Sequence, residues 1–353
     1  MSTTHTPHNF SFDESMFADI LEKFGGLNLF SAEEIMRRFK RSGFRYDHRR
    51  KYYLVLDCET ATLACAMKYS EEERGNIALN MPLIYDIGWQ IIDCYGRVYV
   101  RKSYIVNEIF NNLDIFMTAY YASKRPIYLE KIRRGEAVVA NWEDIAVDLM
   151  ADMAEVEAVG AYNANFDFCK AIPFTEDYFA QTKLPTAQEW MRRKMWYAEK
   201  LAHPNKEEKK AYQNKKRAEE ASLSPAEKAM RNQAKENKKR FFTMRGMDFP
   251  MFDLWGMTVN HLLNCDEYKQ MCLENEWSTT SGRYFPTSAE TAFRFVTGCV
   301  EFEEAHTAIE DSIIESVLFA KIYQIDKTAW TVGIVANPYQ KLGTVKKFVE
   351  EHF

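Results

Sequence analysis

A short apolar segment that ends in two carboxylates constrains the fold of this chain more than any other feature. Residues 52–56 read Tyr-Tyr-Leu-Val-Leu, and Asp57, Cys58 and Glu59 follow at once. A continuous apolar run of this length is typical of a strand that is buried on both faces. Side chains two residues apart on a strand point to the same face. The sequence therefore predicts a central strand that projects the Asp57 and Glu59 carboxylates together from its end.

Three further segments have the composition of strands. Residues 83–92 and 97–105 are predicted to form a hairpin through the turn 93–96, which reads Asp-Cys-Tyr-Gly. Residues 158–162 are short and apolar, as expected for another strand.

Helical patterns separate and follow these strands. Residues 107–158 are mostly helical in pattern, and residues 308–323 predict an amphipathic helix. The apolar stripe of that helix is expected to consist of Ile309, Ile313, Val317 and Ala320. Strands flanked by helices favour an α/β domain with a central mixed sheet.

The chain divides into a central domain and two extensions. The expected parts are an N-terminal helical extension over residues 1–50, a domain over 51–325 and a C-terminal extension over 326–353. Ser31 and Glu34 form a capping box that opens a helix in the first part. In the last part, residues 331–335 are predicted to form a strand and residues 344–351 a helix.

Residues 175–247 are interpreted as a basic helical insertion in the central domain. Residues 206–240 contain 12 Lys and Arg and six Glu, an excess of six positive charges. Ser224, Pro225 and Glu227 open a helix as an N-cap, a first-turn proline and a capping box. Two polar helices joined near Leu223 are therefore expected to project from the domain. This basic arm would contact a polyanion, dock a protein partner, or form a solvated hairpin.

Composition narrows the class of protein. The 353 residues carry a net charge of −5, so the chain is not a polybasic arm, and a polyanionic substrate would have to be bound by local charge. The seven cysteines include no C-x-x-C pair, which argues against a disulfide framework or a zinc site of common spacing. The chain has no apolar stretch of membrane-spanning length and no signal pattern, so a cytoplasmic protein without membrane contact is expected.

Two more short motifs place acidic residues at the starts of helices. Asn163, Phe166 and Asp167 follow the apolar segment 158–162, and Asp167 is expected to start a helix. Each motif alone has an ordinary structural explanation, such as an N-cap aspartate. His306, Ala308 and Asp311 form the more specific pattern His-x-Ala-x-x-Asp at the start of the helix 308–323.

In chain order, the three motifs resemble those of the DEDDh 3′–5′ exonucleases, the DnaQ-like family of the RNase T and DNA polymerase III exonuclease type. The family's motifs read D-x-E, N-x-x-F-D and H-x-A-x-x-D. Supporting likeness lies in Asp86-Ile87-Gly88, in Phe252-Asp253-Leu254-Trp255 and in the capped helix from Thr287 through Glu290 to Gly298. The likeness covers about residues 50–325.

The resemblance implies an RNase H-like exonuclease fold and a two-metal-ion hydrolase that releases nucleoside 5′-monophosphates from single-stranded DNA or RNA 3′ ends. Two Mg²⁺ ions are expected, with Mn²⁺ as a substitute. Asp57 would bridge both ions, and Glu59 and Asp311 would complete the shell of the first ion. Asp167 would support the second ion, directly or through water. His306 would be the general base. Residues expected to bind the 3′-terminal nucleotide are Thr60, Ala61, Asn163 and Phe166.

The sequence departs from the family pattern in two places. The family often has Gly soon after the first motif, whereas Thr60 follows here and residues 61–80 look like an extra loop. Tyr162 stands where the family usually has His before the motif Asn. Two other functions stay open on the same fold: a non-catalytic subunit that binds nucleic acid or a polymerase, and a phosphodiesterase for small nucleotides.

Overall fold

The computed structural model describes residues 46–47, 49–63, 81–180, 214–215, 218, 222–279 and 281–352. The predicted capping box at Ser31 and most of the expected N-terminal extension lie outside these residues. So does most of the predicted loop at 61–80.

The core is one mixed sheet of seven strands. Its strands are β1 (Tyr52–Thr62), β2 (Pro82–Asp93), β3 (Val98–Val106), β4 (Val138–Ala140), β5 (Ala158–Ala161), β6 (Phe241–Met244) and β7 (Met247–Asp253), in the order β4-β3-β2-β1-β5-β7-β6. β2 is antiparallel to β1 and β3, whereas β5 runs parallel to β1 and β7 runs parallel to β5. The predicted α/β class with a central mixed sheet is confirmed.

The strand predictions are largely confirmed, with two corrections. β1 is central, and β2 and β3 form the expected hairpin, closed by the Asp93 N–H donating to the Arg97 carbonyl at 3.1 Å. β1 runs on to Thr62, however, so Asp57 and Glu59 lie within the strand and not at its end. β4 was missed, because its three residues lie in a segment with a helical pattern.

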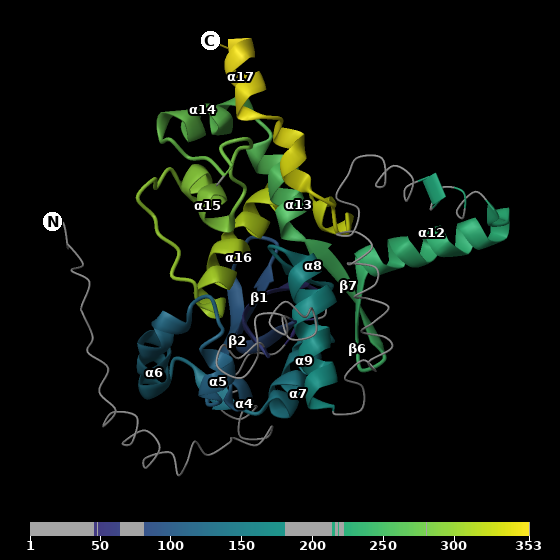
Figure 1. Ribbon diagram of the computed structural model, residues 1–353. Helices are drawn as coiled ribbons and strands as arrows, with labels where there is room; N and C mark the ends of the chain where they lie inside the picture. Colours follow the sequence, from purple (N-terminus) through teal and green to yellow (C-terminus); the bar gives the residue numbers. More distant parts are fainter. Residues whose placement is uncertain are drawn as a thin grey trace.

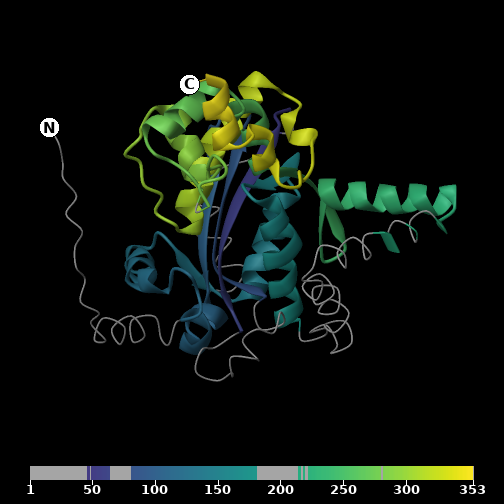
Figure 2. The same cartoon turned by 45° about the horizontal axis from the view of Figure 1, so that its top comes forward.

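Helices cover both faces of the sheet (Figures 1 and 2). One face of the sheet carries Leu54 and Leu56 of β1. It is covered by α4 (Asn107–Phe110), α5 (Leu113–Phe116), α6 (Arg125–Arg134), α7 (Trp142–Met153), the π-helical turn η3 (Asp167–Ala171) and α9 (Ile172–Phe179). The other face carries Tyr53 and Val55 of β1. It is covered by α13 (Leu254–Thr258), α14 (Asp266–Glu274), α15 (Ala289–Thr297), α16 (Ala308–Ile325) and α17 (Val345–His352). The apolar run of β1 is continuous because both of its faces are covered.

Helix α16 lies against β1 and β2 and is buried on most of its circumference. The predicted apolar stripe is therefore wrong in part: Ile309 and Ala320 are buried, but Ile313 and Val317 are only half-buried. Ser312, Glu315 and Ser316 are buried instead. The helix packs against β2 at Gly88, where a Cβ atom would lie 2.7 Å from the Ala308 carbonyl carbon and overlap the Ile309 backbone.

Predictions for the end of the chain are mixed. The helix expected at 344–351 is confirmed as α17. The strand expected at 331–335 is wrong: the chain forms the short 3-10 helix η5 (Ala329–Thr331) and then a loop. There the Val335 N–H donates to the Asp253 carboxylate at 3.3 Å, so this segment pairs with a side chain and not with a strand.

The basic arm is described through its second helix. α12 (Pro225–Arg240) opens as predicted, with the Glu227 N–H donating to Ser224 Oγ at 3.2 Å and the Ser224 N–H donating to Glu227 at 2.8 Å. It projects away from the domain in both views (Figures 1 and 2). Both ends of the predicted 175–247 insertion belong to regular elements of the domain, because α9 extends to Phe179 and residues 241–247 form β6 and begin β7.

None of the helices in the described ranges is both long and apolar enough to cross a lipid bilayer. The six cysteines that the structure describes are all free thiols.

Substitution of Gly88 by Ala should lower the free energy of unfolding by about 1–3 kcal/mol, the usual cost of an added methyl group in a packed core. The new methyl group would push α16 away from β2. Chemical denaturation monitored by circular dichroism measures this loss. Gly135→Ala is the control, because its Cβ would meet no atom within 4 Å and its φ of 72° adds backbone strain alone. An equal or smaller loss for Gly88→Ala would contradict the packing argument.

Candidate metal centre

Carboxylates from the three sequence motifs gather beside the middle of the sheet. Single oxygen atoms of Asp57, Glu59 and Asp311 lie within 4.8 Å of one another. Asp57 and Glu59 come from β1, and Asp311 comes from the first turn of α16, on the sheet face that α16 covers. Single ligand atoms of Glu304, His306 and Asp311 form a second such group. Asp311 therefore links the carboxylates of the strand to the loop that carries His306.

Asp167 approaches the same centre from the end of β5. It follows α8 (Ala164–Phe166), so the helix begins three residues earlier than the sequence predicted. Its carboxylate is buried, accepts a hydrogen bond from the Cys58 thiol, and raises the pKa of Asp57 by its negative charge. Asp167 opens a π-helical turn, a local widening that often marks functional positions.

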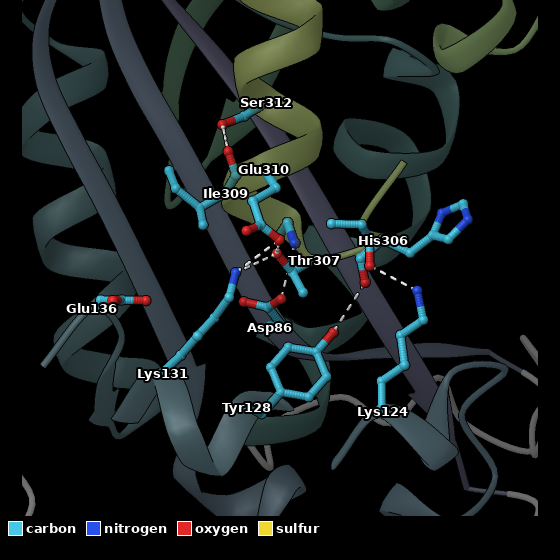
Figure 3. A network of polar contacts seen from close by, with 12 residues as sticks. Asp86, Lys124, Tyr128, Lys131, Glu136, His306, Thr307, Ile309, Glu310 and Ser312 are labelled. Carbon is cyan, nitrogen blue, oxygen red and sulfur yellow. Dashed lines mark hydrogen bonds and ion pairs between the residues drawn. The ribbon is translucent and has the colours of Figure 1, made fainter. Parts of the chain in front are cut away.

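The turn before α16 is fixed by a polar network (Figure 3). The Ala308 N–H donates to Asp86 Oδ2 at 2.9 Å, and Lys131 Nζ donates to Thr307 Oγ1 at 2.8 Å. Lys131 also pairs with Glu310 at 2.9 Å. Because the first N–H groups of a helix lack partners within the helix, the Asp86 carboxylate both caps α16 and anchors it to β2.

His306 occupies a backbone conformation that few non-glycine residues adopt, with φ at 54°. The Tyr128 hydroxyl donates to the His306 carbonyl at 3.4 Å, and Lys124 Nζ donates to the Ala305 carbonyl at 2.7 Å. These bonds hold the main chain, and the imidazole points away from Asp86 and Tyr128 (Figure 3). The ring stacks on Tyr121, with centroids 4.6 Å apart and planes 14° apart.

The surroundings of His306 favour its neutral form. Partial burial and the positive charge of Lys124 lower the pKa of the imidazole, and the negative charge of Glu290 opposes them. Glu304 Oε2 lies 3.5 Å from Nδ1. Since the side chain of His306 remains 32% exposed, its ring is accessible from solvent. A neutral, accessible imidazole is a competent proton acceptor.

Burial and mutual repulsion shift the carboxylates of the centre in one direction. The pKa of Glu59 is raised to about 9, and the pKa values of Asp167 and Asp311 are raised to about 8, in each case mainly by burial. The pKa of Asp57 is also raised, by burial and then by the charges of Glu315, Asp167, Glu59 and Asp311. A divalent cation among these oxygens would remove the repulsion.

The residues present fit a hard divalent cation. All of the clustered donors except His306 are carboxylate oxygens, the ligands that Mg²⁺ and Mn²⁺ prefer. Oδ1 of Asp167 and Oδ1 of Asp311 are buried and accept no hydrogen bond from any residue that the structure describes. Buried oxygens without a donor are costly unless something else satisfies them, and coordination to a cation does so.

The four residues predicted to bind the substrate differ in exposure. Asn163 is exposed, and Thr60 and Phe166 are half-buried. Ala61 is fully buried in the core, so its methyl group cannot line an open pocket.

The Thr118 hydroxyl bonds to both the N–H and the carbonyl of Thr62, which ties the end of β1 to the segment after α5.

Sequence reasoning missed three residues of the centre: Glu304, Tyr121 and Glu315. Glu304 lies two residues before His306, and Glu315 lies one helical turn after Asp311, so both were visible as acidic neighbours of the third motif. Tyr121 could not have been found, because only the tertiary fold places it against His306.

Comparison of the chain with protein-family models, with curated proteins and with solved structures finds no match in any of the three. Conclusions about activity therefore depend on the residues and their geometry.

In the absence of metal, the free energy of unfolding should decrease as the pH rises from 5.5 to 8.5. With pKa values raised to about 8 and 9, the folded chain binds more protons than the unfolded chain between about pH 4 and 9. Urea unfolding in EDTA should show that the free energy of unfolding falls by more than ~1 kcal/mol over this pH range. Saturating Mg²⁺ should restore the lost free energy. Asp311→Asn should reduce the pH dependence, whereas Glu303→Gln, at an exposed site, should leave it unchanged. A stability that rises with pH in EDTA would contradict the electrostatic argument.

Proposed function

We propose that this protein is a metal-dependent 3′–5′ exonuclease that hydrolyses single-stranded DNA or RNA. The observation that carries the proposal is the convergence of Asp57, Glu59 and Asp311 within 4.8 Å, although Asp57 and Asp311 lie 254 positions apart in the sequence. Asp167 and His306, from the remaining motif positions, border the same cluster. The order and directions of the strands are compatible with an RNase H-like core.

The carboxylates would hold two Mg²⁺ ions, or two Mn²⁺ ions. Asp57, Glu59 and Asp311 suit one ion, and Asp57 together with Asp167 suits the second. When bound, two such ions neutralise the scissile phosphate, activate water and stabilise the leaving 3′ oxygen. The protein's own contribution is to fix the carboxylates on β1 and on α16, two elements that pack directly against each other.

His306 would take the proton from the attacking water. Its lowered pKa leaves it neutral at pH 7, and its ring is accessible beside Asp311. The stack against Tyr121 and the hydrogen bonds at the His306 and Ala305 carbonyls restrict its movement. A positioned base of this kind contributes about 10²–10⁴-fold to the rate.

The basic arm would bind the nucleic acid outside the centre. Of the basic side chains that the structure describes on α12, Arg231 and Arg240 are exposed and Lys228 is half-buried. The arm leads into the β6–β7 hairpin, whose turn is fixed by Arg245: its guanidinium donates to Glu143 and Glu176 at 2.7–3.0 Å. An excess of six positive charges over residues 206–240 is sufficient for salt-dependent binding of a polyanion.

The direct test is incubation with 5′-labelled single-stranded DNA or RNA in Mg²⁺, Mn²⁺ or EDTA. The expected result is a ladder that shortens from the 3′ end and is abolished by EDTA. His306→Ala should lower kcat by at least ~10²-fold while binding of the strand is kept, because only the proton acceptor is lost. His352→Ala, near the C-terminus, is the matched control. Strand binding without cleavage in any metal would favour a non-catalytic binding subunit, and undiminished turnover by His306→Ala would refute its role as the base.

Replacement of Lys228, Arg231, Lys235, Lys238 and Lys239 by Gln should weaken single-strand binding and its salt dependence. Each lost phosphate contact should reduce the slope of log K against log salt by ~0.7, and the five together by up to ~3.5. Fluorescence anisotropy at several salt concentrations measures the slope. The control replaces Lys346 and Lys347 on α17. A slope that stays the same in the arm variant would exclude the arm from binding.

A further inference from the structure

The loop before α16 brings together a second set of metal ligands, and this set includes an imidazole. Single ligand atoms of Glu304, His306 and Asp311 lie within 4.8 Å of one another. Glu304 Oε2 and His306 Nδ1 are 3.5 Å apart, which is long for a charge-assisted hydrogen bond. The separation suits two ligands of one tetrahedral ion, which lie ~3.4 Å apart when each bond to the metal is ~2.1 Å long.

Asp311 forms the buried side of this set. Only 6% of the residue is exposed, and its Oδ1 accepts no hydrogen bond from any residue that the structure describes. A buried carboxylate oxygen without a donor is costly, so this position favours a cation as its partner. The nearby Lys124 directs its Nζ to a main-chain oxygen, the carbonyl of Ala305, at 2.7 Å.

Glu304 is held in place from α15. Its N–H donates to Glu290 Oε1 at 3.1 Å, and Glu290 pairs with Arg294 at 2.9 Å. Arg294 also donates to the Phe302 carbonyl at 2.6 Å, so α15 fixes the main chain at two points just before His306. A ligand that is ordered before the ion arrives loses less conformational entropy on binding.

The ring of His306 is oriented by Tyr121 but is not blocked by it. The two rings stack with centroids 4.6 Å apart and planes 14° apart. Stacking covers a face of the imidazole, whereas the lone pair that binds a metal lies in the ring plane, at the edge. The side chain is 32% exposed, so an ion can reach that edge from solvent. Imidazole nitrogen is a common ligand of Zn²⁺, whereas Mg²⁺ prefers oxygen alone.

We propose that Glu304, His306 and Asp311 form a zinc site whose occupation inhibits the reaction proposed for the centre. Three protein ligands with one position left for water are a common zinc arrangement. Coordination at Nδ1 uses the lone pair of the neutral imidazole, so the other ring nitrogen carries the hydrogen and His306 can no longer accept a proton from water. The binding of zinc is independent of the proposed function, whereas the inhibition rests on it.

The first test is titration of the full chain with Zn²⁺ in saturating Mg²⁺, in competition with a chromogenic zinc chelator. Glu304→Gln should bind one zinc ion at least ~10-fold more weakly than the wild type, since even indirect partners of a metal have effects of this size. Glu303→Gln removes an equal charge from the neighbouring exposed position and should bind zinc as the wild type does. Equal zinc affinity of the wild type and Glu304→Gln would overturn the site.

Crystals of the wild type soaked in Zn²⁺ give a test that needs no variant. Anomalous scattering at the zinc edge should place an ion ~2.0–2.2 Å from His306 Nδ1 and from a carboxylate oxygen of Glu304. Zinc found only beyond coordination distance of His306 would refute the assignment.

The effect of zinc on hydrolysis separates this inference from the proposed function. Each rate with zinc is divided by the rate of the same variant in Mg²⁺ alone. Zinc should slow the wild type by at least ~10²-fold, the contribution of the lost base. Half-inhibition of Glu304→Gln should require at least ~10-fold more zinc. Zinc bound at His306 without slower hydrolysis would refute the inhibition. A protein that binds zinc as expected but cleaves no strand in Mg²⁺ would overturn the exonuclease proposal, and the inhibition with it, while confirming the zinc site.

Discussion

The close approach of α16 to β2 is the contact on which the metal centre depends. The helix backbone packs directly over Gly88, where no side chain larger than hydrogen fits, and the Asp86 carboxylate binds the first free N–H of the helix. These two neighbouring residues of β2 fix the distance and the starting point of α16. As a result, Asp311 on its first turn reaches Asp57 and Glu59 on the adjacent strand β1. Lys131 and Tyr128 secure the same turn from α6, so the position of His306 is determined from two sides.

The centre concentrates negative charge to an extent that the protein alone does not balance. Asp57, Glu59, Asp167, Asp311 and Glu315 all have raised pKa values, with burial as the first cause of each. Lys124 is the nearby cation that lowers the pKa values of Glu59 and Asp311, but its Nζ donates to the Ala305 carbonyl. Burial of these carboxylates therefore lowers the stability of the folded protein locally, a pattern that is common at functional sites.

The basic arm is structurally separate from this centre. The β6–β7 turn that follows the arm is fixed by Arg245, which bridges α7 and α9 through Glu143 and Glu176, while α12 extends away from the sheet (Figure 1). In the proposed function, the core would carry the reacting groups and the projecting arm would bind the polyanion, so each would require little from the other. Changes in the arm should therefore act on affinity, whereas changes near Gly88 act on the centre itself.

The sequence by itself determined the central strand, the β2–β3 hairpin, the helix at α16 and the residues Asp57, Glu59, Asp167, His306 and Asp311, because each of these is encoded by local pattern and spacing. It predicted a stripe on α16 through Ile313 and Val317 and a strand at 331–335, and both were wrong. A helix buried on several sides has no single apolar stripe, and the segment after η5 bonds to Asp253 and not to a strand. Only the tertiary structure decided that Glu315 is buried where its charge acts on Asp57 and that Tyr121 stacks on His306. Both contacts join segments far apart in the sequence, so their cause is the packing of α16 and of the α5–α6 region against the sheet, which no local pattern contains.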